Sequence, residues 1–263
     1  MKNNLEILYE DNHIIVVVKP NNILSQSDNT NDIDMLSIIK DYLKEKYNKP
    51  GNVYLGLVHR LDRPVSGVMV FAKTSKAASR LSEQVRTHVL KKQYMAIVWD
   101  DGSLKDKDTF IDYIYKDSDN SSRVVDEKKG KYAELSYEIV ERLKKEKLTL
   151  VDISLKTGRH HQIRVQFASR GYPLFGDQRY GRQDKNQIAL HAYRLEFVHP
   201  TTKEKMVFIS KVVNKSKWSS FVINWLAFAF YFWYIVIRIS REMECNAFFC
   251  WIYEFWFELF YEY

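Results

Sequence analysis

Short apolar segments of strand length, separated by turn residues, recur through most of this 263-residue chain. They are found in LEILYEDNHIIVVVKP (5–20), VMVFAK (68–73), KKQYMAIVW (91–99), YAELSYEIVERL (132–143), LTLVDISLKTG (148–158), ALHAYRLEFVHP (189–200) and KMVFIS (205–210). Helical spacing of apolar residues appears in MLSIIKDYLKEKY (35–47) and in a segment that begins at Thr74 or Ser75. Hairpins therefore outnumber strand–helix–strand crossovers, and the pattern predicts an α+β fold with a large, mostly antiparallel mixed sheet flanked by helices.

The charge of the chain is unevenly distributed. The net charge is +7, but residues 221–263 contain only two basic residues against five acidic ones, so the preceding part is more basic than the whole. A basic excess on a globular body is typical of a protein that binds a polyanion such as nucleic acid. Both cysteines, Cys245 and Cys250, lie late in the chain, which excludes a disulfide framework or a cysteine-ligated zinc site upstream of them. The first residues lack the apolar core of a secretory signal, and we expect a cytoplasmic protein.

One short segment places a carboxylate among cations. In HRLDRPVSG (59–67), Asp62 stands between Arg60 and Arg63, and turn residues follow it. Neighbouring cations favour the ionised form of a carboxylate, and a turn can hold it away from the sheet edge, as a nucleophile requires. The string alone is more typical of a surface ion pair at a turn, so its interpretation as a nucleophile depends on the rest of the chain.

A second segment adds cations and aromatic residues. GRHHQIRVQFASRGYPLFGDQRYGR (158–182) contains five further arginines, and Tyr94 follows two lysines. Arginines and lysines next to aromatic rings suit a phosphate backbone that presents an unstacked base. Together the two segments predict contact with RNA rather than with a small molecule.

These motifs resemble those of the RluA-type pseudouridine synthases. The family pattern HRLDxxTSG, followed by an apolar strand and AKT, stands here as HRLDRPVSGVMVFAKT (59–74). Its later elements stand as KQY (92–94), GRHHQIR (158–164), GYP (171–173), GDQRYG (176–181) and LHAYRLEFVHP (190–200). The resemblance covers about residues 5 to 215 in the family's order. It implies a pseudouridine synthase fold with a central cleft, in a catalytic domain that we place at residues 1–218.

The resemblance also implies an activity and a set of site residues. The activity is that of an isomerase which converts specific uridines of ribosomal or transfer RNA to pseudouridine, without metal or organic cofactor. Asp62 matches the catalytic aspartate, which attacks either the ribose C1′ or the uracil C6. Tyr94 matches the tyrosine that packs on the target base, and Arg164 matches the arginine that pairs with the aspartate. The residues expected to line the pocket or contact RNA are Arg60, Arg63, Lys92, Arg159, His161, Gln162 and Ile163. Neither the RNA nor the uridine follows from the sequence, and no protein partner is implied.

Other functions fit parts of the sequence less well. An RNA-binding module with the same fold but no turnover is the main alternative, and the joint presence of Asp62, Tyr94 and Arg164 argues against it. A metal site is a further alternative, but no HExxH or paired CxxC motif is present. Such a site would have to be built from histidines that are spread along the chain, namely His59, His160, His161, His191 and His199. The phosphate-binding patterns GxxxxGK[ST] and GxGxxG are also absent.

The last segment, residues 219–263, differs in composition from the rest. It is rich in aromatic residues and contains four of the six tryptophans. The run from Phe221 to Ile237 would extend about 25 Å as a helix, at the lower limit for crossing a bilayer. Three interpretations remain: the product of a shifted reading frame, which we favour, a membrane-associated segment, and a docking segment for a partner.

Overall fold

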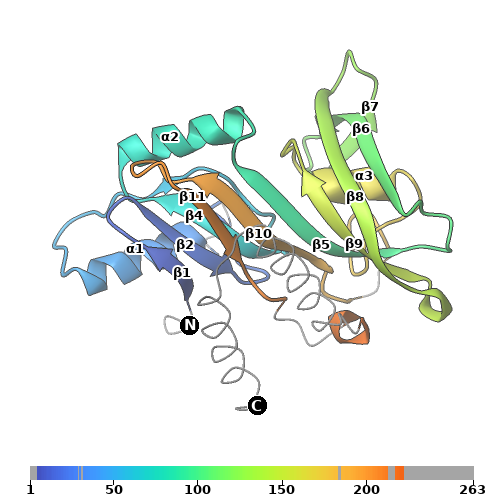
Figure 1. Ribbon diagram of the computed structural model, residues 1–263, viewed down its shortest axis with the longest axis horizontal. Helices are drawn as coiled ribbons and strands as arrows, with labels where there is room; N and C mark the ends of the chain where they lie inside the picture. The colour runs from blue at the N-terminus through green and yellow to red at the C-terminus, as the bar shows by residue number, and fades with distance from the viewer. Residues whose placement is uncertain (1–4, 29, 31, 183–184, 213–216, 222–263) are drawn as a thin grey trace, which may run out of the picture. The chain divides into compact units, whose positions relative to one another are not determined.

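The computed structural model describes residues 5–28, 30, 32–182, 185–212 and 217–221 (Figure 1). They belong to one compact unit, Met1–Phe221, which ends three residues beyond the expected domain boundary at residue 218. Trp218 and Phe221, at its end, are both buried. Within the described part of the chain, no helix is long and apolar enough to cross a membrane. Nearly all of segment 219–263 lies outside the described residues, so its three interpretations stay predictions.

A mixed sheet of eleven strands forms the framework of the described unit. The strands are β1 (Glu6–Glu10), β2 (Ile14–Lys19), β3 (Gly56–Leu57), β4 (Ser66–Ala72), β5 (Lys91–Trp99), β6 (Lys107–Lys116), β7 (Ser122–Val125), β8 (Lys131–Leu143), β9 (Leu148–Leu155), β10 (Leu190–Val198) and β11 (Lys205–Ile209). Their order is β1-β2-β4-β10-β5-β9-β8-β6-β7, with β3 paired to β4 and β11 to β10. Among these pairs only β4 and β10 run parallel, which agrees with the mostly antiparallel sheet predicted from the hairpin pattern.

Two helices cover opposite faces of the first half of the sheet. Helix α1 (Met35–Lys46) packs Met35 and Ile39 into one cluster with Ile15 of β2, whereas α2 (Ser75–Arg86) packs Leu81 into another with Ile14. Adjacent residues of a strand point to opposite faces, so β2 is buried on both sides. This explains why its sequence, IIVVVK, is continuously apolar instead of alternating.

The first two helices begin at side-chain caps near the positions that the sequence predicted. The side chain of Asp34 accepts a hydrogen bond from the Ser37 N–H at the start of α1, and Thr74 does the same for Ala77 at the start of α2. A third helix, α3 (Gln162–Ala168), follows β9 and lies against the second half of the sheet (Figure 1). Two short 3-10 helices, Lys144–Glu146 and Lys217–Ser220, complete the elements.

Candidate active site

Asp62 lies in the loop between β3 and β4, and the backbone around it is held from several sides. The Ser25 hydroxyl donates to the Leu61 carbonyl at 2.7 Å, and the amides of Asn21 and Gln187 both donate to the Pro64 carbonyl at 2.8 Å. The Val65 N–H closes the turn on the Asp62 carbonyl at 3.0 Å. The carboxylate of Asp62 itself remains 28% exposed. The loop therefore presents a reachable carboxylate on a fixed backbone.

Gly67, at the start of β4, lets this loop approach β10. Its φ of +137° is one that side chains rarely adopt, and an added Cβ would lie 2.3 Å from the carbonyl oxygen of Ala192. This is the point where β4 pairs in parallel with β10. The glycine of the HRLDRPVSG motif thus joins the Asp62 loop to the middle of the sheet.

A buried lysine also holds the backbone of this loop, at Arg63. Lys19 is fully buried, and its ammonium donates to three carbonyl oxygens, those of Pro20 at 3.0 Å, Ile23 at 2.6 Å and Arg63 at 3.0 Å. Burial lowers the pKa of Lys19 to about 7, although the nearby charge of Asp62 partly opposes this shift. The sequence analysis assigned this residue no role, yet it links β2 directly to the residue after Asp62.

Arg164 of α3 contacts Asp62 and is itself fixed by Asp177. Its Nη1 atom lies 3.4 Å from Asp62 Oδ2, while Nε and Nη2 each donate to a carboxylate oxygen of Asp177 at 2.8 Å. Burial opposes the charges of both partners, but their two-pronged bond outweighs it, so the pKa of Arg164 is raised and that of Asp177 is lowered. Arg164 is consequently a rigid cation, and its third nitrogen, Nη1, points toward Asp62.

His161 supplies a second donor next to Asp62. Its Nε2 atom lies 3.7 Å from Asp62 Oδ2, and its Nδ1 atom lies 2.7 Å from the Tyr180 hydroxyl. That hydroxyl accepts the Ser122 N–H at 2.7 Å and can donate its own proton to His161 Nδ1. In this arrangement the ring proton is on Nε2, the nitrogen that lies closer to the carboxylate. Burial lowers the pKa of His161 to about 4, so the ring is neutral near pH 7.

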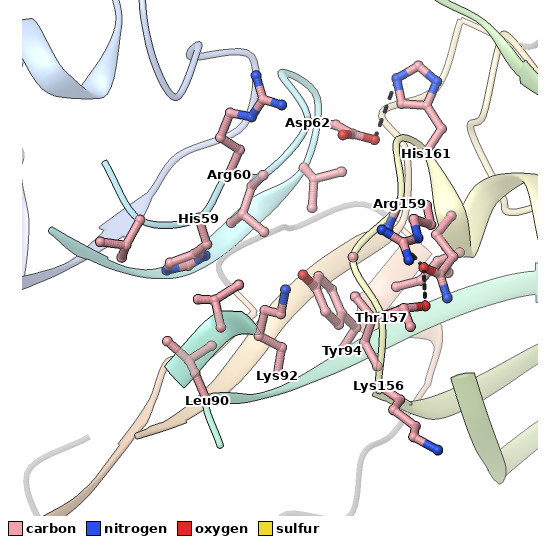
Figure 2. A pocket seen from close by; sticks show the side chains of 18 of the residues that line it. His59, Arg60, Asp62, Leu90, Lys92, Tyr94, Lys156, Thr157, Arg159 and His161 are labelled. Atoms are coloured by element: carbon pink, nitrogen blue, oxygen red, sulfur yellow. Dashed lines mark hydrogen bonds and ion pairs between the residues drawn. The ribbon is translucent and has the colours of Figure 1, made fainter. Parts of the chain in front are cut away.

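A cavity of about 710 Å³ opens between the Asp62 loop, β5 and the segment that leads into α3 (Figure 2). Tyr94 of β5 forms part of its wall and is 5% exposed. Burial, and secondarily the charge of Asp62, raises the pKa of Tyr94, so its hydroxyl is protonated at neutral pH.

The cavity brings together nine of the ten residues that the sequence nominated. They are Arg60, Asp62, Lys92, Tyr94, Arg159, His161, Gln162, Ile163 and Arg164. Arg63 points elsewhere, and its guanidinium lies 2.8 Å from Asp32 on the surface. Gln162 is buried, and its Oε1 atom accepts hydrogen bonds from the Thr157 hydroxyl and the Arg159 N–H. Its contacts order the loop before α3.

Several arginines of segment 158–182 have structural partners. The guanidinium of Arg170 contacts Asp112 at 2.8 Å and lies over the ring of Phe110, and that of Arg182 lies over the ring of Trp99. Arg164 is held by Asp177, as described above. The exposed cations that line the cavity include Arg60 and Arg159.

The histidines do not form a metal site in the described residues. There, no group of three or more histidine, cysteine, aspartate or glutamate side chains could hold a metal ion. His191 lies between the hydroxyls of Ser66 and Ser210, and His199 contacts Asp11 at 2.9 Å. His59 accepts the Val70 N–H, and His160 contacts the Ser122 hydroxyl. Each ring is thus used in a separate hydrogen-bonding arrangement.

Comparison with known proteins identifies the family. The model of the RNA pseudouridylate synthase family matches residues 13–169, and the chain belongs to this family. The solved structures of human RNA pseudouridylate synthase domain containing 4 and 1 resemble it with TM-scores of 0.65 and 0.64, at 21% and 22% identity. The first match covers 79% of this chain and 88% of that one, the second 81% and 85%, and they support the pseudouridine synthase fold.

Among curated relatives, the ribosomal large subunit pseudouridine synthase C of Buchnera aphidicola is 33% identical over 76% of this chain and 65% of its own length. An RNA pseudouridine synthase of Bacillus subtilis, YhcT, is 37% identical over 77% and 67%. The dual-specificity RNA pseudouridine synthase RluA of Haemophilus influenzae is 34% identical over 79% and 93%. The matched part of the chain thus spans about two thirds of the first two relatives and nearly all of the third.

Proposed function

We propose that the protein is an RNA pseudouridine synthase with Asp62 as its nucleophile. The observation that carries this proposal is the position of the Asp62 carboxylate, which lies at a cavity lined by Tyr94 and next to two fixed donors, His161 and Arg164. Arg164 donates a hydrogen bond to this carboxylate, and the partial exposure of Asp62 leaves it accessible to a substrate. In a structural ion pair the two charged groups usually bond each other closely. Here Arg164 bonds Asp177 at 2.8 Å and lies farther from Asp62, at 3.4 Å, so Asp62 is not the main partner of Arg164.

The reaction is an isomerisation in which one glycosidic bond replaces another. The N1–C1′ bond breaks, C5 becomes bonded to C1′, C5 loses its proton and N1 gains one. Attack by Asp62 at C1′ or at C6 satisfies this balance equally, and both routes need an anionic carboxylate. Tyr94 orients the ring while it turns, and the cavity walls keep the detached base in place. The chemistry requires neither an electron donor nor an acceptor.

We infer that the substrate is a uridine in folded RNA. Such a base must leave its stack, at a cost of a few kcal/mol, to reach a cavity of this kind. Arg60 and Arg159, at the cavity, can offset this cost by contacting phosphates or occupying the space left by the base. The name of the Buchnera relative favours ribosomal large-subunit RNA, and transfer RNA, which the family resemblance also allows, is the second candidate.

Tritium release from RNA labelled at C5 of uridine tests the proposal. Unmodified transcripts of large-subunit ribosomal RNA and of transfer RNAs would be incubated with the full chain, and the modified position mapped by mass spectrometry. We expect release from at least one RNA class, at one or a few uridines. Binding without release on every RNA would instead favour the RNA-binding module without turnover.

RNA affinity should fall steeply with salt. Neutralising two phosphates by Arg60 and Arg159 releases counterions, so raising salt from about 50 to about 200 mM should weaken binding by about tenfold. Arg60→Ala should reduce the slope by about one unit, and Lys105→Ala, an exposed residue paired with Asp108, should not. Filter binding at several salt concentrations measures both slopes. A flat wild-type curve would show that this basic surface does not carry the RNA.

Tyr180→Phe should slow the reaction about tenfold at saturating RNA. The variant keeps the ring over which the Arg164 guanidinium lies, but it loses the hydrogen bond that orients His161. Without that donor, the pKa of His161 should rise from about 4, and the acid limb of the rate profile should move to higher pH. Tyr113→Phe is the matched control because it removes a hydroxyl that contacts Glu127 on the exposed surface, away from the cavity. Equal rates and equal pH profiles in all three proteins would exclude a role for the Tyr180 hydroxyl.

A further inference from the structure

The cavity contains an ammonium group that no acceptor satisfies. Lys92 lies two residues before Tyr94 on β5, so both side chains extend from the same face of the strand. In the described part of the protein, no carbonyl, hydroxyl or carboxylate accepts a hydrogen bond from its Nζ atom. Burial lowers the pKa of Lys92, as expected for a cation without a counter-ion. The side chain of Lys92 is only partly buried and lines the cavity, so a ligand that enters the cavity can reach the ammonium.

A second donor without an acceptor lies nearby. His59 is 7% exposed, and its Nε2 atom accepts the Val70 N–H at 3.1 Å, so Nδ1 carries the ring proton. This Nδ1–H is buried and has no hydrogen-bond partner among the described residues. Burial, with the charge of Lys92 as a second cause, lowers the pKa of His59 to about 3, and the ring therefore stays neutral. Figure 2 shows His59 and Lys92 extending into the same part of the cavity.

The position of Gly158 keeps this ammonium reachable. Its backbone is not in the left-handed region, so no turn demands a glycine there. A Cβ at this position would instead lie 3.1 Å from Lys92 Nζ. A side chain at position 158 would crowd the ammonium of Lys92, whereas glycine leaves space for a ligand next to it.

We propose that Lys92 is a catalytic residue that stabilises negative charge on the uracil ring, an inference that rests on the proposed function. Its ammonium donates a hydrogen bond to a carbonyl oxygen of the base, and the His59 Nδ1–H is a supporting donor. A base that lies on Tyr94 places its edge along β5, in the direction of Lys92. Donors that are already oriented before charge develops lower the barrier most.

The charge requirement is the same for both routes of attack. If Asp62 attacks C1′, uracil leaves with the electron pair of the N1–C1′ bond, and the negative charge spreads to its carbonyl oxygens. If Asp62 attacks C6, the electrons of the C5–C6 double bond move toward the C4 carbonyl oxygen. Lys92 forms no covalent bond and transfers no proton in either case. Its contribution is electrostatic and therefore does not depend on which atom Asp62 attacks.

Lys92→Met tests the proposal, because methionine keeps the length of the side chain without its charge. We expect the single-turnover rate at saturating RNA to fall about 100-fold. The RNA dissociation constant and its salt slope should change by less than about twofold. The Tm should change by less than about 2 °C, because Lys92 is partly exposed and its ammonium is not a fully buried charge. Lys105→Met, on the exposed surface, is the control.

Two outcomes of this kinetic test would overturn the proposal. A weaker RNA affinity with a shallower salt slope and an unchanged rate at saturation would make Lys92 a phosphate anchor. A lower Tm with a rate within about threefold of wild type would make it a structural residue.

A binding experiment without RNA separates this inference from the proposed function. Barbiturate, a planar uracil-like anion near pH 7, and neutral uracil would be titrated into the full chain with NMR detection. We expect wild type to bind barbiturate about tenfold more tightly than uracil, and Lys92→Met to lose this preference. Equal affinities in wild type, or no measurable binding of either ligand, would contradict a site for an anionic base. If the protein modified no RNA but still bound barbiturate more tightly than uracil, only the proposed function would be refuted.

Discussion

Asp62→Asn should abolish pseudouridine formation while leaving the protein folded and able to bind RNA. An amide is nearly the same size as a carboxylate, but it cannot act as the anionic nucleophile, and a loss of about 1,000-fold or more in rate is expected. The loop should keep its shape because its hydrogen bonds involve Leu61, Arg63 and Pro64 rather than the Asp62 side chain. Tritium release in single-turnover conditions measures the rate, and filter binding measures the affinity.

The matched control for this experiment is Asp41→Asn, on the exposed side of α1. It makes the same chemical change away from the cavity and should retain wild-type turnover. If Asp62→Asn kept more than about a tenth of the wild-type rate on any RNA, another group would have to be the nucleophile, and the proposed mechanism would fail.

Asp177→Ala should destabilise the protein by about 3–5 kcal/mol, which is the usual cost of leaving one member of a buried ion pair without its partner. The side chain of Asp177 is fully buried and that of Arg164 is 7% exposed, so water cannot replace the lost bonds. Arg164 would also be free to turn entirely toward Asp62 or away from it. Turnover should therefore fall in parallel, which urea denaturation and single-turnover kinetics would measure separately.

The pH dependence of unfolding provides a check on this pair. The pKa of Asp177 is lowered in the folded protein, so its contribution to stability is present above the pKa of the unfolded state and is lost as pH falls through the folded value. The stability difference between wild type and Asp177→Ala should accordingly shrink in acid. Asp112→Ala, which removes the partner of the more exposed Arg170, should cost less. An equal decrease in the free energy of unfolding for both variants would mean that burial does not determine how much an ion pair contributes to stability.

The elements predicted from the sequence are those that carry a periodic pattern. Both α1 and α2 have one apolar face and a capping side chain, and β2 and β4 are apolar runs between turn residues. Helix α3 escaped prediction because six of its seven residues are buried, polar ones included, so no polar face marks its period. Strand β6 escaped because only Phe110 and Ile114 are buried along its length.

The cavity could be anticipated only in part. Motifs in the sequence nominated Asp62, Tyr94 and Arg164, and the fold places all three at one cavity; their chemical roles stay predictions. The supporting contacts of Lys19, Asp177 and Tyr180 could not be derived, because each joins segments that are distant along the chain. Lys19 looked like the end of a strand, yet its ammonium holds the carbonyl of Arg63, 44 positions away.

The contact between Ser122 and Tyr180 is made by a main-chain N–H, which every amino acid except proline provides. A replacement that fits the buried site of Ser122 therefore keeps this hydrogen bond, although it removes the contact between the Ser122 hydroxyl and His160. Proline at this one position is the exception, and its effect would resemble that of losing the tyrosine hydroxyl.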